Sequence, residues 1–174
     1  FLEMSDSELD NIFSQADMFL FLTDSFEAQS FGNILALKYL TPALWGGWYD
    51  KSRTSEIFYQ IPKHTEACFR CCMSSRYKVQ EKNPIQISSN SNTIFHSQLL
   101  DSQIGLLTLA ILHRDEKSFQ ADGETPLESK LLFDSLFDKQ GRAYNFFHHK
   151  AHPLGGNRLF ESAYGHLGNT SKLF

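Results

Sequence analysis

The stretch ADMFLFLTDSFEAQSFGNILAL, residues 16–37, decides the fold because it joins an apolar strand to a helix. Residues 17–23 hold a continuous apolar run, which is typical of a central parallel strand covered on both faces. Asp24 and Glu27 then have the spacing of a capping box, so we expect Asp24 to open a helix that reaches about residue 40.

A second capping-box pair, Ser5 and Glu8, predicts another short helix before the strand. Helix, buried strand and helix in this order indicate an α/β fold with a doubly wound sheet. Further elements follow from local patterns. We expect strands at residues 43–49 and 55–62, a polar surface loop at 78–93, a long apolar helix at 94–113, a helix from Thr125 to about Lys139, a strand at 143–149 and an irregular tail to Phe174.

Composition excludes several classes of protein. Hydrophobic residues make up 41% of the chain and aromatic residues 14%, which indicates a packed core rather than disorder. The net charge of −4 argues against a nucleic-acid-binding surface. No apolar run approaches the length of a membrane span, and the three crowded cysteines favour a reducing, cytoplasmic compartment.

Asp24 is the first candidate functional residue. It follows a predicted strand, and ligands of open α/β sheets bind at the carboxyl ends of the strands. A carboxylate there could hold Mg²⁺ against the phosphates of a nucleotide. The structural alternative, that Asp24 only caps its helix, stays open.

All three cysteines lie in EACFRCCMSSRY, residues 66–77. Cys68 and Cys71 have the separation of one edge of a tetrahedral zinc site, although no second pair follows. We disfavour a redox pair because no strong helix pattern follows the cysteines. Two inert buried thiols are a third interpretation, and Cys72 has no assigned role.

Three histidines, His148, His149 and His152, could in principle complete a Cys₂His₂ zinc site, but we favour ordinary strand histidines. No glycine-rich phosphate loop, nucleophile elbow or kinase signature is present in the sequence. The motifs therefore do not compose a whole active site.

Taken in order, the motifs resemble the second half of the adenylation domain of the ThiF/MoeB/HesA family, relatives of the ubiquitin-activating enzymes. In that family a strand ends in Thr-Asp, a helix carries an Asn, and the next strand carries Gly-Gly or Gly-Ala before a short β segment and C-[YF]-R-C. The matching residues here are Thr23, Asp24, Asn33, Gly46, Gly47, Pro62, Cys68 and Cys71.

The resemblance implies a Rossmann-like doubly wound sheet and ATP-dependent adenylation of the C-terminus of a ubiquitin-like or sulfur-carrier protein. It implies that Asp24 positions Mg²⁺ and ATP, that Asn33 contacts the nucleotide, and that Cys68 and Cys71 bind a structural Zn²⁺ with a second C-x-x-C. Family members are usually dimers; the apolar face of residues 104–112 is compatible with a homodimer and equally with a core helix, so both interpretations stay open, and a cytoplasmic location is expected.

Three departures accompany the resemblance. Gln29 stands where the family usually has an Arg, the second C-x-x-C is missing, and the family's glycine-rich loop would precede Phe1. We therefore expect the C-terminal half of such a domain, with an adenylation core at 1–113 and an extension at 114–174, inactive as this segment alone. The alternatives are a catalytically inactive subunit that binds a protein partner and a generic Rossmann-type binding domain.

Overall fold

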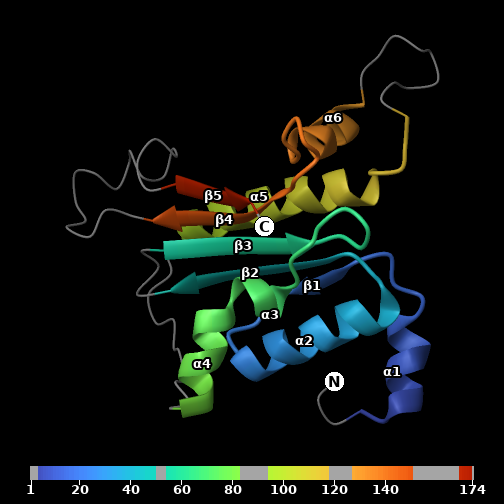
Figure 1. Cartoon of the computed structure of the whole chain (residues 1–174), viewed down its shortest axis with the longest axis vertical. Helices are drawn as coiled ribbons and strands as arrows, with labels where there is room; N and C mark the ends of the chain where they lie inside the picture. Colours follow the sequence, from blue (N-terminus) through green and yellow to red (C-terminus); the bar gives the residue numbers. More distant parts are fainter. Residues whose placement is uncertain (1–3, 50–53, 83–93, 118–126, 151–168, 174) are drawn as a thin grey trace.

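An open mixed sheet with helices on both faces is the frame of the molecule (Figure 1). The computed structural model describes residues 4–49, 54–82, 94–117, 127–150 and 169–173. In spatial order the strands are β1 (Phe19–Phe21), β2 (Ala43–Tyr49), β3 (Thr54–Gln60) and β4 (Tyr144–Lys150), with β5 (Asn169–Leu173) paired to the outer edge of β4. Among these described strands β1 and β2 are parallel, and each later strand is antiparallel to its neighbour.

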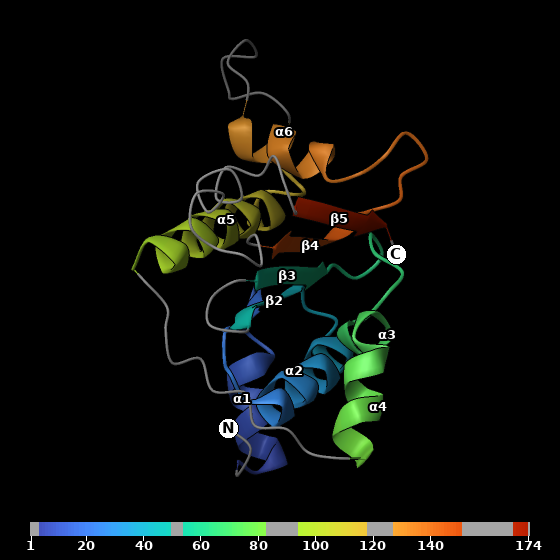
Figure 2. The same ribbon diagram turned by 90° about the vertical axis from the view of Figure 1, so that its left-hand side faces the viewer.

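The helices divide between the two faces of the sheet (Figures 1 and 2). One face carries α1 (Asp6–Phe13), α2 (Phe26–Tyr39), α3 (Phe69–Cys72) and α4 (Ser74–Lys82), and the other carries α5 (Ile94–Leu112) and α6 (Glu128–Ser135). The described structure is thus a mixed α/β fold, which confirms the coarse fold class expected from the sequence.

Aromatic rings form the core beneath α2 and α3. Trp45 of β2 stacks on Phe69 of α3 with 4.8 Å between ring centroids and on Phe21 of β1 with 5.2 Å. Helix α2 lies close against β1 because Gly32 has no side chain, and a Cβ there would sit 2.6 Å from the Phe21 ring. This core holds α2 and the segment after β3 in fixed positions relative to the sheet.

Helix α5 buries one stripe on the opposite face of the sheet. Ile104, Leu107 and Ile111 join a core cluster with Leu44 and Tyr59 of the sheet. Other leucines of the same helix are exposed, so the apolar sequence of α5 is buried along one side only; these are Leu106, Leu109 and Leu112. The helix itself was correctly predicted, and none of the described helices is long and apolar enough to cross a membrane.

Several predicted elements agree with the structure. The capping box of Ser5 and Glu8 is present at α1. The strands expected at 43–49, 55–62 and 143–149 are β2, β3 and β4.

Strand β1 differs from its prediction in its surroundings. Phe19 and Phe21 are buried, whereas Leu20 is 46% exposed and Leu22, just after the strand, is 52% exposed. The expectation of a central strand covered on both faces is therefore wrong within the described residues, because β1 is the edge of the sheet and one of its faces is only partly covered.

Four boundary predictions are also wrong. Ser25, not Asp24, is the N-cap of α2, since its side chain accepts a hydrogen bond from the Ala28 amide. Helix α4 occupies part of the loop expected at 78–93, where residues 83–93 lie outside the described part. Helix α6 begins after Leu127, with no side-chain cap, and ends at Ser135 rather than near Lys139. The tail expected to be irregular contains β5.

Candidate functional site

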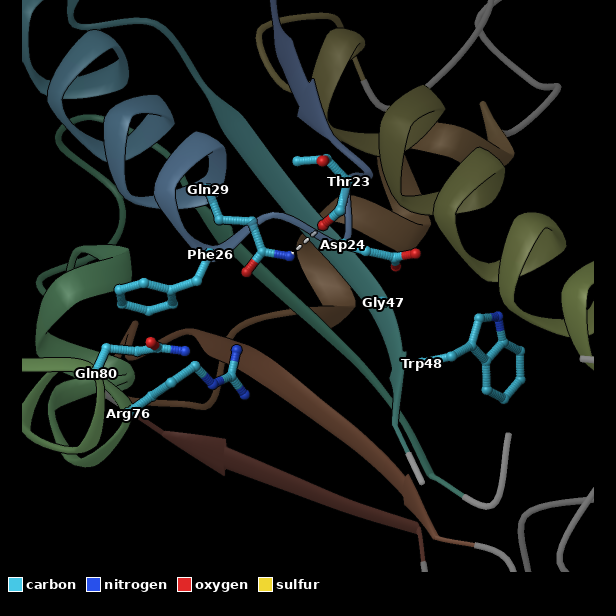
Figure 3. A pocket seen from close by; sticks show the side chains of 8 residues that line it. All are labelled: Thr23, Asp24, Phe26, Gln29, Gly47, Trp48, Arg76 and Gln80. Atoms are coloured by element: carbon cyan, nitrogen blue, oxygen red, sulfur yellow. Dashed lines mark hydrogen bonds between the residues drawn. The ribbon is translucent and has the colours of Figure 1, made fainter. Parts of the chain in front are cut away.

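A shallow pocket opens at the carboxyl end of β1, where α2 begins and where β2 and α4 pass (Figure 3). It occupies about 370 Å³, its open mouth included. The lining residues come from the β1–α2 segment (Thr23, Asp24, Phe26, Gln29), from β2 (Gly47, Trp48) and from α4 (Arg76, Gln80).

Asp24 lies at this pocket, as the sequence predicted for a ligand site. Capping of α2 is done by Ser25, whose Oγ accepts from the Ala28 amide at 3.2 Å. The Asp24 side chain is exposed and makes no hydrogen bond or ion pair with any other described residue. In Figure 3 it extends toward Trp48, away from Arg76 and Gln80. The capping interpretation of Asp24 is thus wrong, and its carboxylate is available to a cation.

Gln29, at the position where the family of the sequence resemblance usually has an Arg, makes its hydrogen bonds to other parts of the protein. Its side-chain Nε2 donates to the Thr23 main-chain carbonyl oxygen at 2.6 Å, and the main-chain carbonyl oxygen of Gln29 accepts from the Trp45 indole N–H at 3.0 Å. The residue is 8% exposed. It therefore fixes the start of α2 to the end of β1, and it brings no positive charge to the pocket.

Arg76 is the cation of the pocket lining, and it is paired. One terminal nitrogen, Nη2, donates to both carboxylate oxygens of Glu56, at 2.9 and 3.1 Å. The two side chains are 21% and 11% exposed, so the pair is shielded from solvent more than a surface salt bridge. Much of the charge of Arg76 is thereby compensated by Glu56 of β3.

The two glycines of β2 have different surroundings. A Cβ on Gly46 would lie 2.8 Å from Cδ1 of Ile104, so Gly46 permits the close approach of α5. A Cβ on Gly47 would meet nothing within 4 Å, and Gly47 lines the pocket. The predicted close approach at this pair is confirmed for Gly46, while Gly47 leaves the pocket open beside Asp24.

Asn33 is not brought to the pocket lining. It lies on α2, is 5% exposed, and its Oδ1 has no hydrogen-bond partner among the described residues. Its contact with a nucleotide stays a prediction based on the family resemblance.

Cys68 and Cys71 form a close pair away from the pocket lining. Their Sγ atoms are 3.5 Å apart, which is near the edge of about 3.8 Å expected between two thiolates on one zinc ion. A closed structural zinc site needs four ligands. Within the part of the chain that the structure describes, no group of three or more His, Cys, Asp or Glu residues is placed to hold a metal ion, so this donor set does not by itself fit such a site.

Two of the three candidate histidines lie in β4, and their role as zinc ligands stays a prediction. In the strand register, His148 pairs with Glu56 and His149 with Ser55, and His152 lies outside the described residues.

Sequence reasoning missed the contribution of α4. Arg76 and Gln80 lie in or next to a segment expected to be a loop, and only Tyr77 of α4 is buried. The available signal was weak, because SSRYKVQEK contains helix-forming residues but no apolar stripe.

Comparison with known proteins adds no assignment. No family model matches the chain, and no curated protein matches it significantly.

Proposed function

We propose that the chain is the C-terminal half of a ThiF-like adenylation domain, which activates the C-terminus of a ubiquitin-like or sulfur-carrier protein with magnesium and ATP. The observation that carries this proposal is the unpaired Asp24 carboxylate directly after the parallel strand β1. That is the place where open α/β sheets bind their ligands.

The order of the elements supports a Rossmann-like interpretation. Strand β1, helix α2 and the parallel strand β2 form one βαβ unit, with Thr23 and Asp24 after its first strand. Strand β2 carries Gly46 and Gly47, and the antiparallel β3 leads to the cysteine pair. These motifs resemble the ThiF family in the same order, now attached to elements of the expected kinds.

Among the described residues no strand pairs with the outer edge of β1, which supports the proposal of a second half of the domain. A short apolar edge strand is open to pairing with a further strand. Leucines beside this edge are exposed on β1 and just after it (Leu20, Leu22), and further apolar residues of α2 are exposed (Ile34, Leu37). Under this proposal the remaining half of the sheet pairs with β1 and covers part of this surface.

In the proposed reaction these residues would mainly position magnesium ATP. When bound, magnesium ATP supplies the adenylyl group that passes to the terminal carboxylate of the carrier, and pyrophosphate leaves. Asp24 would hold the metal and so orient the phosphates, and Gly47 leaves space beside it. The basic phosphate ligands would have to come from the other half of the domain, since Gln29 is neutral and Arg76 is engaged by Glu56.

One observation favours a second candidate, a catalytically inactive subunit that binds a ubiquitin-like or conjugating partner. The cation of the pocket lining, Arg76, is engaged by Glu56, and the position where the family of the resemblance usually has an Arg holds the neutral Gln29, bound to Thr23. Structural zinc and homodimerisation stay predictions under either candidate.

Pyrophosphate exchange distinguishes the two candidates. The full-length protein is incubated with ATP, Mg²⁺, labelled pyrophosphate and the ubiquitin-like proteins of its organism, and binding of each carrier is measured in parallel by calorimetry. Carrier-dependent incorporation of label into ATP is expected for the enzyme. Carrier binding without any exchange would overturn the enzymatic proposal and support the inactive subunit.

A further inference from the structure

Cys68 and Cys71 form a dithiol at the surface of the molecule. The Cys68 Sγ lies 3.5 Å from the Cys71 Sγ, Cys71 is exposed, and Cys68 is half-buried. Two sulfur atoms at this distance approach a disulfide length of about 2.05 Å after small side-chain rotations. One of the thiols is also open to a reagent from solvent.

The backbone around the pair is held by buried contacts. Phe69, between the two cysteines, is 1% exposed and stacks on Trp45. Its amide donates to Oε1 of the buried Gln60 at 3.1 Å, and the Cys72 amide donates to the Cys68 carbonyl oxygen at 3.1 Å. The two thiols therefore share one short, anchored turn, which lowers the entropic cost of joining them.

This structure corrects the reason for disfavouring a redox pair. Helices α3 and α4 do follow Cys68, and Cys68 itself is the N-cap residue of α3. The zinc interpretation, in contrast, has two ligands in the part of the chain that is described, where a structural site needs four.

We propose that Cys68 and Cys71 form a reversible disulfide by exchange with a small-molecule disulfide of the glutathione type. In the first step the Cys71 thiolate attacks one sulfur of the oxidised reagent, an S–S bond forms, and one reagent thiolate leaves. The Cys68 thiolate then attacks the Cys71 Sγ and expels the second reagent thiolate. The protein dithiol loses two electrons and two protons, and the reagent disulfide gains them to become two thiols.

Cys72 is the internal control for this site. It follows Cys71 directly in the chain, but its side chain is half-buried and packs against the aromatic core with Trp45 and Phe69. Cys68 is also half-buried, but its Sγ lies 3.5 Å from that of Cys71, and this distance selects Cys68 as the partner. The proposal does not depend on Asp24 or on the pocket, and it stands in place of the structural zinc that the family resemblance implies at these two cysteines.

The test is a redox titration of the full-length protein. The reduced protein, its zinc content measured, is equilibrated without oxygen in oxidised and reduced glutathione at a series of ratios. Free thiols are then blocked with N-ethylmaleimide, and the products are identified by intact mass and peptide mapping. The variants are Cys68→Ser, Cys71→Ser and, as matched control, Cys72→Ser.

The oxidised wild-type protein is expected to lose about 2 Da, and among the three cysteines of this sequence only Cys72 is expected to carry a blocking group. Cys72→Ser keeps the same transition, whereas Cys68→Ser and Cys71→Ser give only mixed disulfides with glutathione. A stable mixed disulfide in the wild type, or a bond to Cys72, would overturn the proposal. So would one zinc ion per chain that protects both thiols from oxidation until it is chelated.

Discussion

Strands β3 and β1 belong to the same sheet, yet they differ in how completely they are covered. In β3 the consecutive residues Ile57, Phe58 and Tyr59 are all at most 2% exposed, so both faces are buried. In β1 only alternate residues are buried, and Leu20 is 46% exposed. Both faces of β3 are thus covered by the core, whereas one face of β1, next to the candidate site, is partly exposed to solvent. This contrast predicts that stability resides in the centre of the sheet and that the β1 edge serves a further contact.

The largest expected difference in the free energy of unfolding is between two alanine substitutions, one in β3 and one in β1. Phe58→Ala should destabilise the protein by about 3–5 kcal/mol, since it removes a fully buried ring from the aromatic core. Leu20→Ala should cost less than about 1 kcal/mol because half of that side chain is already in water. Urea unfolding followed by circular dichroism measures both values. Equal losses for the two variants would remove the contrast between the strands.

Two helix glycines, one on α2 and one on α5, test how closely α2 packs on the covered face of β1. Gly32→Ala should destabilise by about 1–3 kcal/mol, because the new Cβ would sit 2.6 Å from the Phe21 ring. Gly105→Ala is the matched control on α5, where a Cβ meets nothing within 4 Å, and it should stabilise by about 0.5–1 kcal/mol through helix propensity. Thermal unfolding of both variants tests the opposite signs. Stabilisation by both would show that α2 does not pack closely on β1.

The ion pair of Arg76 and Glu56 at the pocket should contribute more to the free energy of unfolding than a surface pair does. A double-mutant cycle with Arg76→Met and Glu56→Gln should give a coupling free energy of about 1–2 kcal/mol, because the pair is shielded and its hydrogen bonds are charge-assisted. The matched cycle uses Lys38 and Asp10, whose side chains are 46% and 57% exposed, and it should give a smaller coupling free energy because solvent screens that pair. Reversal of that order would mean that Arg76 does not bind Glu56 in solution.

The smallest effect is a pH dependence at the outer end of α2. Hydrogen bonds from the Tyr39 hydroxyl and the Lys38 ammonium hold the pKa of the Asp10 carboxyl below its usual range. A lowered pKa in the folded state means that the stabilisation is present above the unfolded pKa of about 4 and is lost as the pH falls through the folded value. Asp10→Asn should remove this acid sensitivity, measured as the difference in unfolding midpoint between pH 6 and pH 2. If Asp10→Asn leaves the difference between the two midpoints unchanged, the contacts of Asp10 with Tyr39 and Lys38 do not stabilise the folded protein.

How far the sequence predicted the structure depended on the density of apolar residues. Strand β2 and helix α5 are rich in them, and their bounds were close to those expected. Helix α4 and strand β5 are polar, and each is placed by tertiary contacts: Tyr77 packs on Phe26 with 4.8 Å between ring centroids, and β5 pairs with β4. Local patterns cannot show such contacts.

The candidate site was predicted in part for the same reason. Asp24 was found because it follows an apolar run, and the cysteine pair because of its spacing. The pairing of Arg76 with Glu56 joins residues twenty positions apart on different elements, and the turning of Gln29 onto Thr23 depends on the geometry of the β1–α2 connection. These contacts decide how much positive charge the pocket offers, and no local sequence pattern encodes them.

The most direct test of the central claim is carrier-dependent ATP–pyrophosphate exchange by the full-length protein, compared between Asp24→Ala and Glu27→Ala. Both residues are exposed and lie near the start of α2, but only Asp24 lines the pocket. We predict that Asp24→Ala lowers the exchange rate by about a hundredfold through lost positioning of the phosphates, while Glu27→Ala changes it by less than about twofold. Exchange that is unchanged in Asp24→Ala would remove Asp24 from the mechanism and contradict the account.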